Sequence, residues 1–100
     1  MDKRRKHIDR EAEHALRQQF YERIQRGDIS VAEAVKSMRR ISLLTQAEFA
    51  KHRGVSLRVL KEIEAGTANP TLETLNRIGA IFGLRVGFVA TPKNLPERPD

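Results

Sequence analysis

The stretch TQAEFAKHRGVSLRVLKEIEAG, residues 45–66, holds two short helical patterns that meet at a glycine. Thr45 with Glu48 has the spacing of a capping box, and Ser56 is a candidate N-cap for the second helix. Gly54 lies between the helices, where a tight turn requires a positive φ that other residues adopt only at a cost. Such a pair of helices is either a tight hairpin in a small core or a means of placing one helix in a DNA groove.

The residues before this stretch predict two further helices. Apolar side chains recur at three- and four-residue steps over residues 8–24, and Gly27 is the expected stop. Ser30 with Glu33 is another capping box, and the helix that it opens should end near Ser42. The side chains expected to face the core are Ile8, Ala12, Ala15, Leu16, Phe20 and Ile24 in the first helix and Val31, Ala34, Val35, Met38 and Ile41 in the second, with Lys36, Arg39 and Arg40 outside.

The residues after residue 66 predict one more helix. Pro70 and Thr71 are typical of a helix start, and Gly83 of a helix end. The apolar face expected for this helix is Leu72, Leu75, Ile78, Ile81 and Phe82.

Residues 84–90, LRVGFVA, change to a period of two, which is typical of a strand. A lone strand leaves backbone donors and acceptors without partners, and the sequence shows no second strand. The first hypothesis is that this strand pairs with its copy in another subunit through Leu84, Val86 and Phe88. The alternative is an extended segment packed along the helices.

These patterns predict a division of the chain into four parts. Residues 1–29 form a basic N-terminal segment and an extra helix, and residues 30–83 form the domain that contains the hairpin. Residues 84–91 form the dimerisation strand. Residues 92–100 contain three of the four prolines and are expected to be a mobile tail.

Composition narrows the function. The net charge of +6 suits a polyanionic partner, most often nucleic acid. The absence of cysteine excludes disulfides, thiolate zinc sites and cysteine nucleophiles. His7, His14 and His52 lack the close spacing of metal ligands, and no glycine-rich phosphate loop is present. We therefore expect no metal, no cofactor and no enzymatic activity.

No apolar run reaches the roughly 20 residues that span a bilayer. The first residues, MDKRRKHIDREAEH, are charged where a signal peptide would be apolar. These features predict a cytoplasmic protein with no membrane partner.

Five motifs follow one another at fixed spacings. They are LTQAEFA at 44–50, GVS at 54–56, IEAG at 63–66, NPTLETL at 69–75 and IGAIFG at 78–83. In this combination, residues 33–83 resemble the lambda-repressor-like helix-turn-helix family, also called the Cro/CI or XRE type. The resemblance covers about half of the chain. It implies a mainly α fold, a five-helix helix-turn-helix domain, here with an extra N-terminal helix and a C-terminal strand that pairs between subunits.

The resemblance also implies roles for individual residues. The family docks the helix that corresponds to residues 56–64 in the major groove, with Leu57, Arg58 and Glu62 at positions that touch base edges. An arginine can hold guanine, a leucine can contact a thymine methyl, and a glutamate can accept from cytosine. The candidate phosphate contacts are Thr45, Gln46, Ser56, Lys61, Thr67 and Asn69.

This chain departs from many relatives in having an apolar residue at Leu57 and an acid at Glu62, so each base contact has an alternative. Arg58 and Lys61 would then lie on a solvated helix face, and Glu62 would pair with Arg58 within the helix. Thr45 would serve only as a cap.

A helix-turn-helix domain followed directly by a short strand resembles the HipB-like antitoxins, in which the strands of two subunits pair. That resemblance implies a homodimeric repressor that binds double-stranded DNA upstream of its own toxin–antitoxin genes and also binds a toxin. Two alternatives remain open. One is a protein-interaction module with little DNA binding, and the other is a stand-alone repressor without a toxin.

Overall fold

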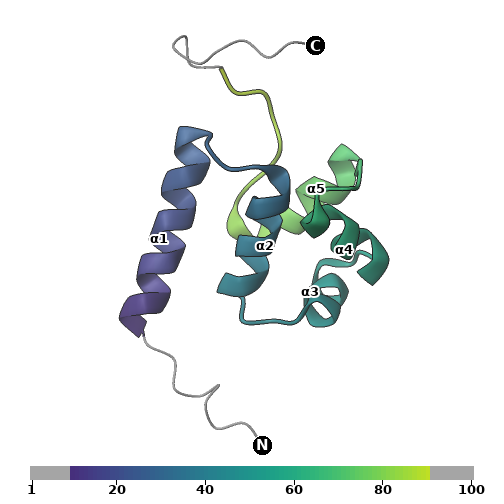
Figure 1. Cartoon of the computed structure of the whole chain (residues 1–100), viewed down its shortest axis with the longest axis horizontal. Coiled ribbons are helices and arrows are strands. Elements are labelled where there is room, and N and C mark those ends of the chain that lie inside the picture. The colour runs from purple at the N-terminus through teal and green to yellow at the C-terminus, as the bar shows by residue number, and fades with distance from the viewer. Residues whose placement is uncertain (1–9, 91–100) are drawn as a thin grey trace, which may run out of the picture.

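The computed structural model describes residues 10–90 of the 100-residue chain, and Figure 1 shows that these residues are mainly helical, as predicted. The predictions for Ile8 and for the tail at residues 92–100 lie outside the described residues. Residues 10–90 contain five α-helices and one 3-10 helix: α1 (Arg10–Arg26), α2 (Val31–Ile41), α3 (Gln46–Arg53), α4 (Leu57–Ala65), α5 (Leu72–Gly79) and η2 (Ala80–Phe82). Four of the α-helices and η2 belong to the helix-turn-helix unit, and α1 is the predicted extra helix.

The predicted caps account for where the helices begin. Both capping boxes form: the hydroxyl of Ser30 accepts from the backbone N–H of Glu33, and the hydroxyl of Thr45 accepts from that of Glu48. Gly54 adopts φ +70° at the C-terminus of α3, in the left-handed region that favours glycine. The turn of the helical hairpin is therefore confirmed in the geometry that the sequence predicts.

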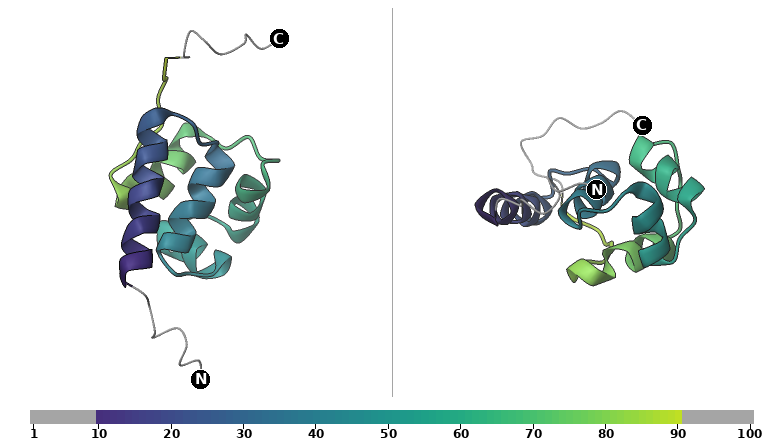
Figure 2. Two further views of the ribbon diagram at one scale, coloured as in Figure 1. Left: turned by 60° about the vertical axis from the view of Figure 1, so that its left-hand side comes forward. Right: turned by 90° about the horizontal axis from the view of Figure 1, so that it is seen from below.

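Every α-helix contributes to a single core. Phe49, Leu60 and Ile78, from α3, α4 and α5, are the largest fully buried side chains. The other buried apolar residues are Phe20, Ala34, Val35, Met38, Ile41, Ala50 and Ile63. α2 lies between α1 on one side and the helical hairpin of α3 and α4 on the other (Figure 2).

Several side chains expected in the core are exposed, and the reasons are local. Val31 and Leu72 are the first residues of α2 and α5, where a helix has only one neighbouring turn to cover it. Ile81 lies in η2, where three residues per turn replace 3.6 and rotate its side chain outward. Within α1, Ala12, Ala15 and Leu16 are likewise exposed.

The extra helix α1 is held to the domain by an aromatic cluster. Phe20 is buried and meets Phe82 edge to face, with ring centroids 5.9 Å apart. The hydroxyl of Tyr21 donates to the backbone carbonyl of Phe82 over 2.9 Å. The guanidinium of Arg17 lies 5.8 Å from the centroid of the same ring. These contacts link α1 to η2, 61 residues further along the chain from Tyr21.

Residues 84–90 are extended but form no strand within the described part of one chain. The N–H of Leu84 donates to the carbonyl of Gly79 over 3.0 Å, and the N–H of Val86 donates to Oδ1 of Asn76 over 2.8 Å. In a single copy, residues 84–90 are therefore an extended segment packed along the helices, which was the alternative to a paired strand. Pairing with a second copy stays a prediction.

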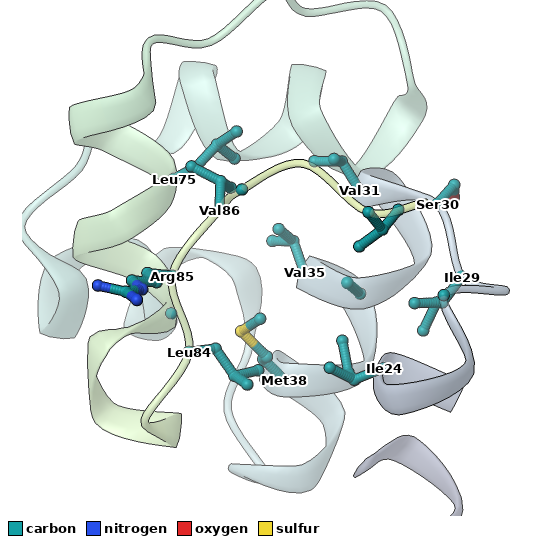
Figure 3. A pocket seen from close by; sticks show the side chains of 15 residues that line it. Ile24, Ile29, Ser30, Val31, Val35, Met38, Leu75, Leu84, Arg85 and Val86 are labelled. Atoms are coloured by element: carbon teal, nitrogen blue, oxygen red, sulfur yellow. The ribbon is translucent and has the colours of Figure 1, made fainter. Parts of the chain in front are cut away.

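The segment and the helices enclose an apolar groove of about 460 Å³ (Figure 3). Val35 and Met38 form its floor, and Leu84 and Val86 form one wall. The remaining described lining includes Ile24, Ile29, Val31 and Leu75. Phe88 lies just beyond this wall in the chain and is fully exposed.

A Tyr21→Phe substitution tests the attachment of α1. It keeps the ring and removes the hydrogen bond to Phe82, which should lower the free energy of unfolding by about 1 kcal/mol. Phe20→Ala removes a buried ring and should cost about 3–5 kcal/mol. Urea denaturation of the two variants measures both losses. Tyr21→Phe with wild-type stability would show that the hydroxyl does not hold α1.

Candidate nucleic-acid interface

The helix α4 presents two different faces. Its inward face carries Leu60, Ile63 and Glu64, all buried. Its outward face carries Arg58 and Lys61, which are exposed to solvent. The predicted docking helix therefore stands with its basic side directed away from the protein.

Two of the three predicted base-contacting side chains are joined to each other. Nε of Arg58 lies 3.3 Å from Oε2 of Glu62, one helical turn later. The Arg58 side chain is 86% exposed and that of Glu62 is 45% exposed, so the pair is solvated and worth only about 0.3–0.5 kcal/mol. Leu57 is also exposed, at the first position of α4. The structure brings the three side chains to the outward face of α4. In the absence of DNA, Arg58 and Glu62 form the intrahelical pair that was the alternative to base contacts.

The two helix starts supply the groups that suit a phosphate. Thr45 and Ser56 are the N-caps of α3 and α4, and the hydroxyl of Ser56 accepts from the N–H of Val59 over 3.0 Å. In each helix the caps leave first-turn N–H groups without an intrahelical partner, at the positive end of the helix dipole. Both hydroxyls act as caps here, and phosphate contact by these two residues stays a prediction.

The loop after α4 holds the last two predicted phosphate contacts. The N–H and the hydroxyl of Thr67 both donate to the carbonyl of Glu62, over 3.0 and 3.4 Å. Asn69 is exposed two residues later. Thr67 thus closes the C-terminus of α4, and Asn69 extends from the loop that follows.

Gln46 has a structural partner that the sequence did not reveal. Its amide nitrogen donates to Oε1 of Glu64 over 3.0 Å. Arg39 binds the same carboxylate through two nitrogens, at 2.8 Å to Oε2 and 3.0 Å to Oε1. A further nitrogen of Arg39 donates to the carbonyl of Leu44 over 3.2 Å. One carboxylate on α4 therefore connects α2, α3 and the loop between them.

The expectation that Arg39 lies outside the core is wrong, because only 19% of its side chain is exposed. A signal was present in the sequence. Glu64 follows Ile63 and lies four residues after Leu60, which places its carboxylate on the inward face of the helix. A buried carboxylate requires a partner, and the arginine of a neighbouring helix is the best geometric match.

The environment of Glu64 determines its charge state. Burial alone would raise the pKa of Glu64. The hydrogen bonds from Arg39 and Gln46, together with the positive charges of Arg39 and Lys36, outweigh burial and lower the pKa below its ordinary value of 4.5. The bond to Glu64 in turn raises the pKa of Arg39. The pair is therefore ionised throughout the neutral range.

No group of three or more histidine, cysteine, aspartate or glutamate side chains within residues 10–90 could hold a metal ion. None of the described helices combines the length and the apolar character needed to cross a membrane.

Comparison with known proteins identifies the family of the chain. The family model described as helix-turn-helix matches residues 35–89, which is more than half of the chain. The chain belongs to this helix-turn-helix family, the XRE-type, lambda-repressor-like class. No curated protein and no solved structure matches the chain. The family match supports a DNA-binding transcriptional regulator and covers α3, α4 and the Gly54 turn between them.

The Glu64 network predicts a specific dependence of stability on pH. Because folding lowers the pKa of Glu64, its contribution to stability is complete above about 4.5 and is lost as the pH falls through the lower folded value. Glu64→Gln should lower the free energy of unfolding at neutral pH by about 1–3 kcal/mol. On acidification, the variant should then lose less stability than the wild type.

Urea denaturation at neutral pH and at about pH 3 measures both effects. Glu73→Gln is the matched control, because Glu73 is exposed and paired within α5 with Arg77. Its loss of stability on acidification should parallel that of the wild type. If Glu64→Gln also parallels the wild type, then the buried carboxylate does not contribute to stability as a charged group.

Proposed function

We propose that this protein is a sequence-specific repressor that binds an inverted-repeat operator as a homodimer. The observation that carries the proposal is the outward face of α4, where Arg58 and Lys61 are exposed, together with the capped start of α3, which Gln46 joins to Glu64 of α4. A helix N-terminus beside a basic helix face offers a phosphate contact and a groove-reading element together. The support for this function is the positively charged surface of α4, and the proposal does not depend on a cavity.

The proposal gives each side chain of α4 a task. Arg58 reads guanine through its guanidinium, Leu57 packs against a thymine methyl, and Glu62 accepts from a cytosine amino group. The solvated Arg58–Glu62 pair costs little to break, so both side chains are available when a duplex arrives. The proposed phosphate contacts are Thr45, Gln46, Ser56, Lys61, Thr67 and Asn69.

The proposed dimer forms through residues 84–89. Alternate residues of an extended chain direct their backbone groups to opposite edges. The N–H groups of Leu84 and Val86 already bind α5, so pairing with a second copy would use the other edge, at Arg85, Gly87 and Val89. An antiparallel pair centred on Gly87 satisfies twofold symmetry, which is the usual symmetry of a homodimer.

This pairing accounts for Phe88. In the proposed register, Phe88 of one copy lies opposite Val86 of the other, on the face that borders the apolar groove. The fully exposed ring would then be covered by the second subunit. Two docking helices related by the twofold axis suit half-sites about 34–36 Å apart on DNA.

We further propose that the protein is the antitoxin of a toxin–antitoxin operon and represses its own genes, with the toxin as its protein partner. The support is the order of its elements, a helix-turn-helix unit followed directly by an extended apolar segment. A stand-alone repressor has the same fold and differs only in having no toxin. The gene that neighbours this one distinguishes the two.

A protein-interaction module is the second candidate function. The observation that favours it is the pairing of Arg58 with Glu62 beside an apolar Leu57, which leaves the docking helix less basic than its position requires. A gel shift on the DNA upstream of the gene, repeated over a range of salt concentrations, separates this module from a repressor. Binding that weakens steeply with salt supports the repressor.

An Arg58→Ala substitution tests the docking role of α4. Loss of a bidentate guanine contact is worth about 1–3 kcal/mol, so operator affinity should fall by about 5- to 150-fold. The melting temperature should change little, because the side chain is 86% exposed. Arg26→Ala removes the same charge from α1 and should leave operator affinity nearly unchanged. Equal affinities of Arg58→Ala and wild type would remove Arg58 from the interface.

A Phe88→Asp substitution tests the dimer. A charge at this position should prevent burial of the segment against a second copy, so the variant should sediment as a monomer where the wild type sediments as a dimer. Ile81→Asp is the matched control, because Ile81 is also apolar and exposed but lies outside the segment. A Phe88→Asp variant that remains dimeric would place the interface elsewhere.

A further inference from the structure

Two neighbouring residues of α5 bind two different parts of the chain. Oδ1 of Asn76 accepts from the N–H of Val86 over 2.8 Å, and Nη1 of Arg77 donates to the backbone carbonyl of Gly54 over 3.1 Å. The first bond holds the extended segment through which we propose that two copies pair. The second bond holds the turn between α3 and α4. One turn of α5 therefore connects the proposed subunit contact to the helical hairpin.

The contact between α5 and this turn is reciprocal. Nη2 of Arg53, the last residue of α3, donates to the backbone carbonyl of Arg77 over 2.9 Å. That carbonyl lies in the last turn of α5, where a cation also suits the negative end of the helix dipole. A Cβ on Gly54 would lie 3.6 Å from Cδ of Arg77, so the aliphatic part of the arginine packs against the turn as well. Two hydrogen bonds and a packing contact thus fix the turn to α5.

The turn leads directly into α4. Ser56, two residues after Gly54, is the N-cap of α4, and Leu57 and Arg58 are its first two residues. A bond that fixes the carbonyl of Gly54 therefore fixes the place where the proposed base-reading end of α4 begins. The backbone of α5 approaches those of α2 and η2 closely and that of the hairpin at few points. Arg77 supplies a polar link where the hairpin and α5 are otherwise joined by side chains of the core.

Arg77 also has a partner within its own helix. Its Nη2 lies 3.1 Å from Oε2 of Glu73, and the two side chains are 50% and 80% exposed. A solvated pair of this kind contributes little to stability. The bond to Gly54 joins residues 23 positions apart, in different elements. The bond to the turn is therefore the one that can position α4.

We propose that Arg77 is a positioning residue for DNA binding, and that with Asn76 it sets the separation of half-sites that the dimer accepts. Two docking helices match successive major grooves only when the path from the subunit contact to each helix has a fixed length and direction. Here that path runs from Val86 through α5 to Gly54. The inference rests on the proposed function, because it requires pairing through residues 84–89 and DNA binding by α4.

An Arg77→Lys substitution tests the inference without changing the net charge. Lysine lacks the fork of donors that lets Arg77 bind Glu73 and Gly54 at once. Arg26→Lys makes the same exchange at an exposed position of α1 and is the matched control. Each full-length protein is titrated by fluorescence anisotropy with three duplexes. They are the inverted repeat selected by the wild type, the same repeat with one base pair added between its half-sites, and a single half-site.

The wild type should bind the selected repeat more tightly than the lengthened one, because one added base pair turns the second half-site by about 34–36°. In Arg77→Lys this ratio of affinities should fall by about three- to tenfold, which is the worth of one hydrogen bond within a protein. The affinity of Arg77→Lys for a single half-site should stay at the wild-type value, because the core of each subunit still holds α4. Arg26→Lys should match the wild type with all three duplexes.

A wild-type ratio in Arg77→Lys would overturn the inference and leave the proposed function standing. An equal loss of affinity for all three duplexes would also overturn it, because Arg77 would then support the folding of α4 and not its placement. Asn76→Ala breaks the other bond of the path and should lower the ratio in the same way, and a wild-type ratio there would count against the inference.

The wild type separates this inference from the proposed function. If it binds the selected and the lengthened repeats equally, then no separation is set and the inference alone fails. If it binds no duplex, then the proposed function fails and the inference fails with it.

Discussion

Glu64 is a buried, negatively charged residue in the core of the domain, and its carboxylate accepts hydrogen bonds from Arg39 and Gln46. Only 4% of the Glu64 side chain is exposed, so its carboxylate depends on these bonds in place of water. An apolar side chain of similar volume could be equally stable at this position. The contribution of these bonds is to the orientation of α4. They fix the rotation of α4 about its axis, so that Leu60 faces the core and Arg58 faces solvent.

The elements outside the helix-turn-helix unit leave the outward face of α4 free. α1 lies on the side of α2 opposite to α4 (Figures 1 and 2) and is attached to the domain through Tyr21 and Phe82. The extended segment at residues 84–90 follows η2 and passes close to Gly79 of α5, where a Cβ would lie only 2.9 Å from the carbonyl oxygen of Leu84. The proposed DNA-binding face and the proposed subunit contact thus lie on different surfaces of the domain.

Local chemistry made much of this fold predictable. A capping box such as that of Thr45 marks a helix start because its hydroxyl and backbone satisfy each other within one turn. Contacts across the fold were harder to predict: the bond between Arg39 and Glu64 joins residues 25 positions apart. Ile81 was placed in the core because a 3.6-residue period was assumed where the chain tightens to a 3-10 turn. Residues 84–90 were predicted as a strand, yet a strand requires a partner that one chain does not supply. Within the candidate site, the pair of Arg58 and Glu62 was predictable from their spacing of four residues, whereas the bond of Gln46 to Glu64, 18 positions away, was not.

Selection of bound duplexes from random DNA by the wild-type protein tests the central claim most directly. If α4 docks in the major groove from each subunit of a twofold dimer, the selected sequences should share an inverted repeat with half-site centres about 10–10.5 base pairs apart. A pool that remains random after repeated rounds at low salt would contradict the claim that this helix reads DNA.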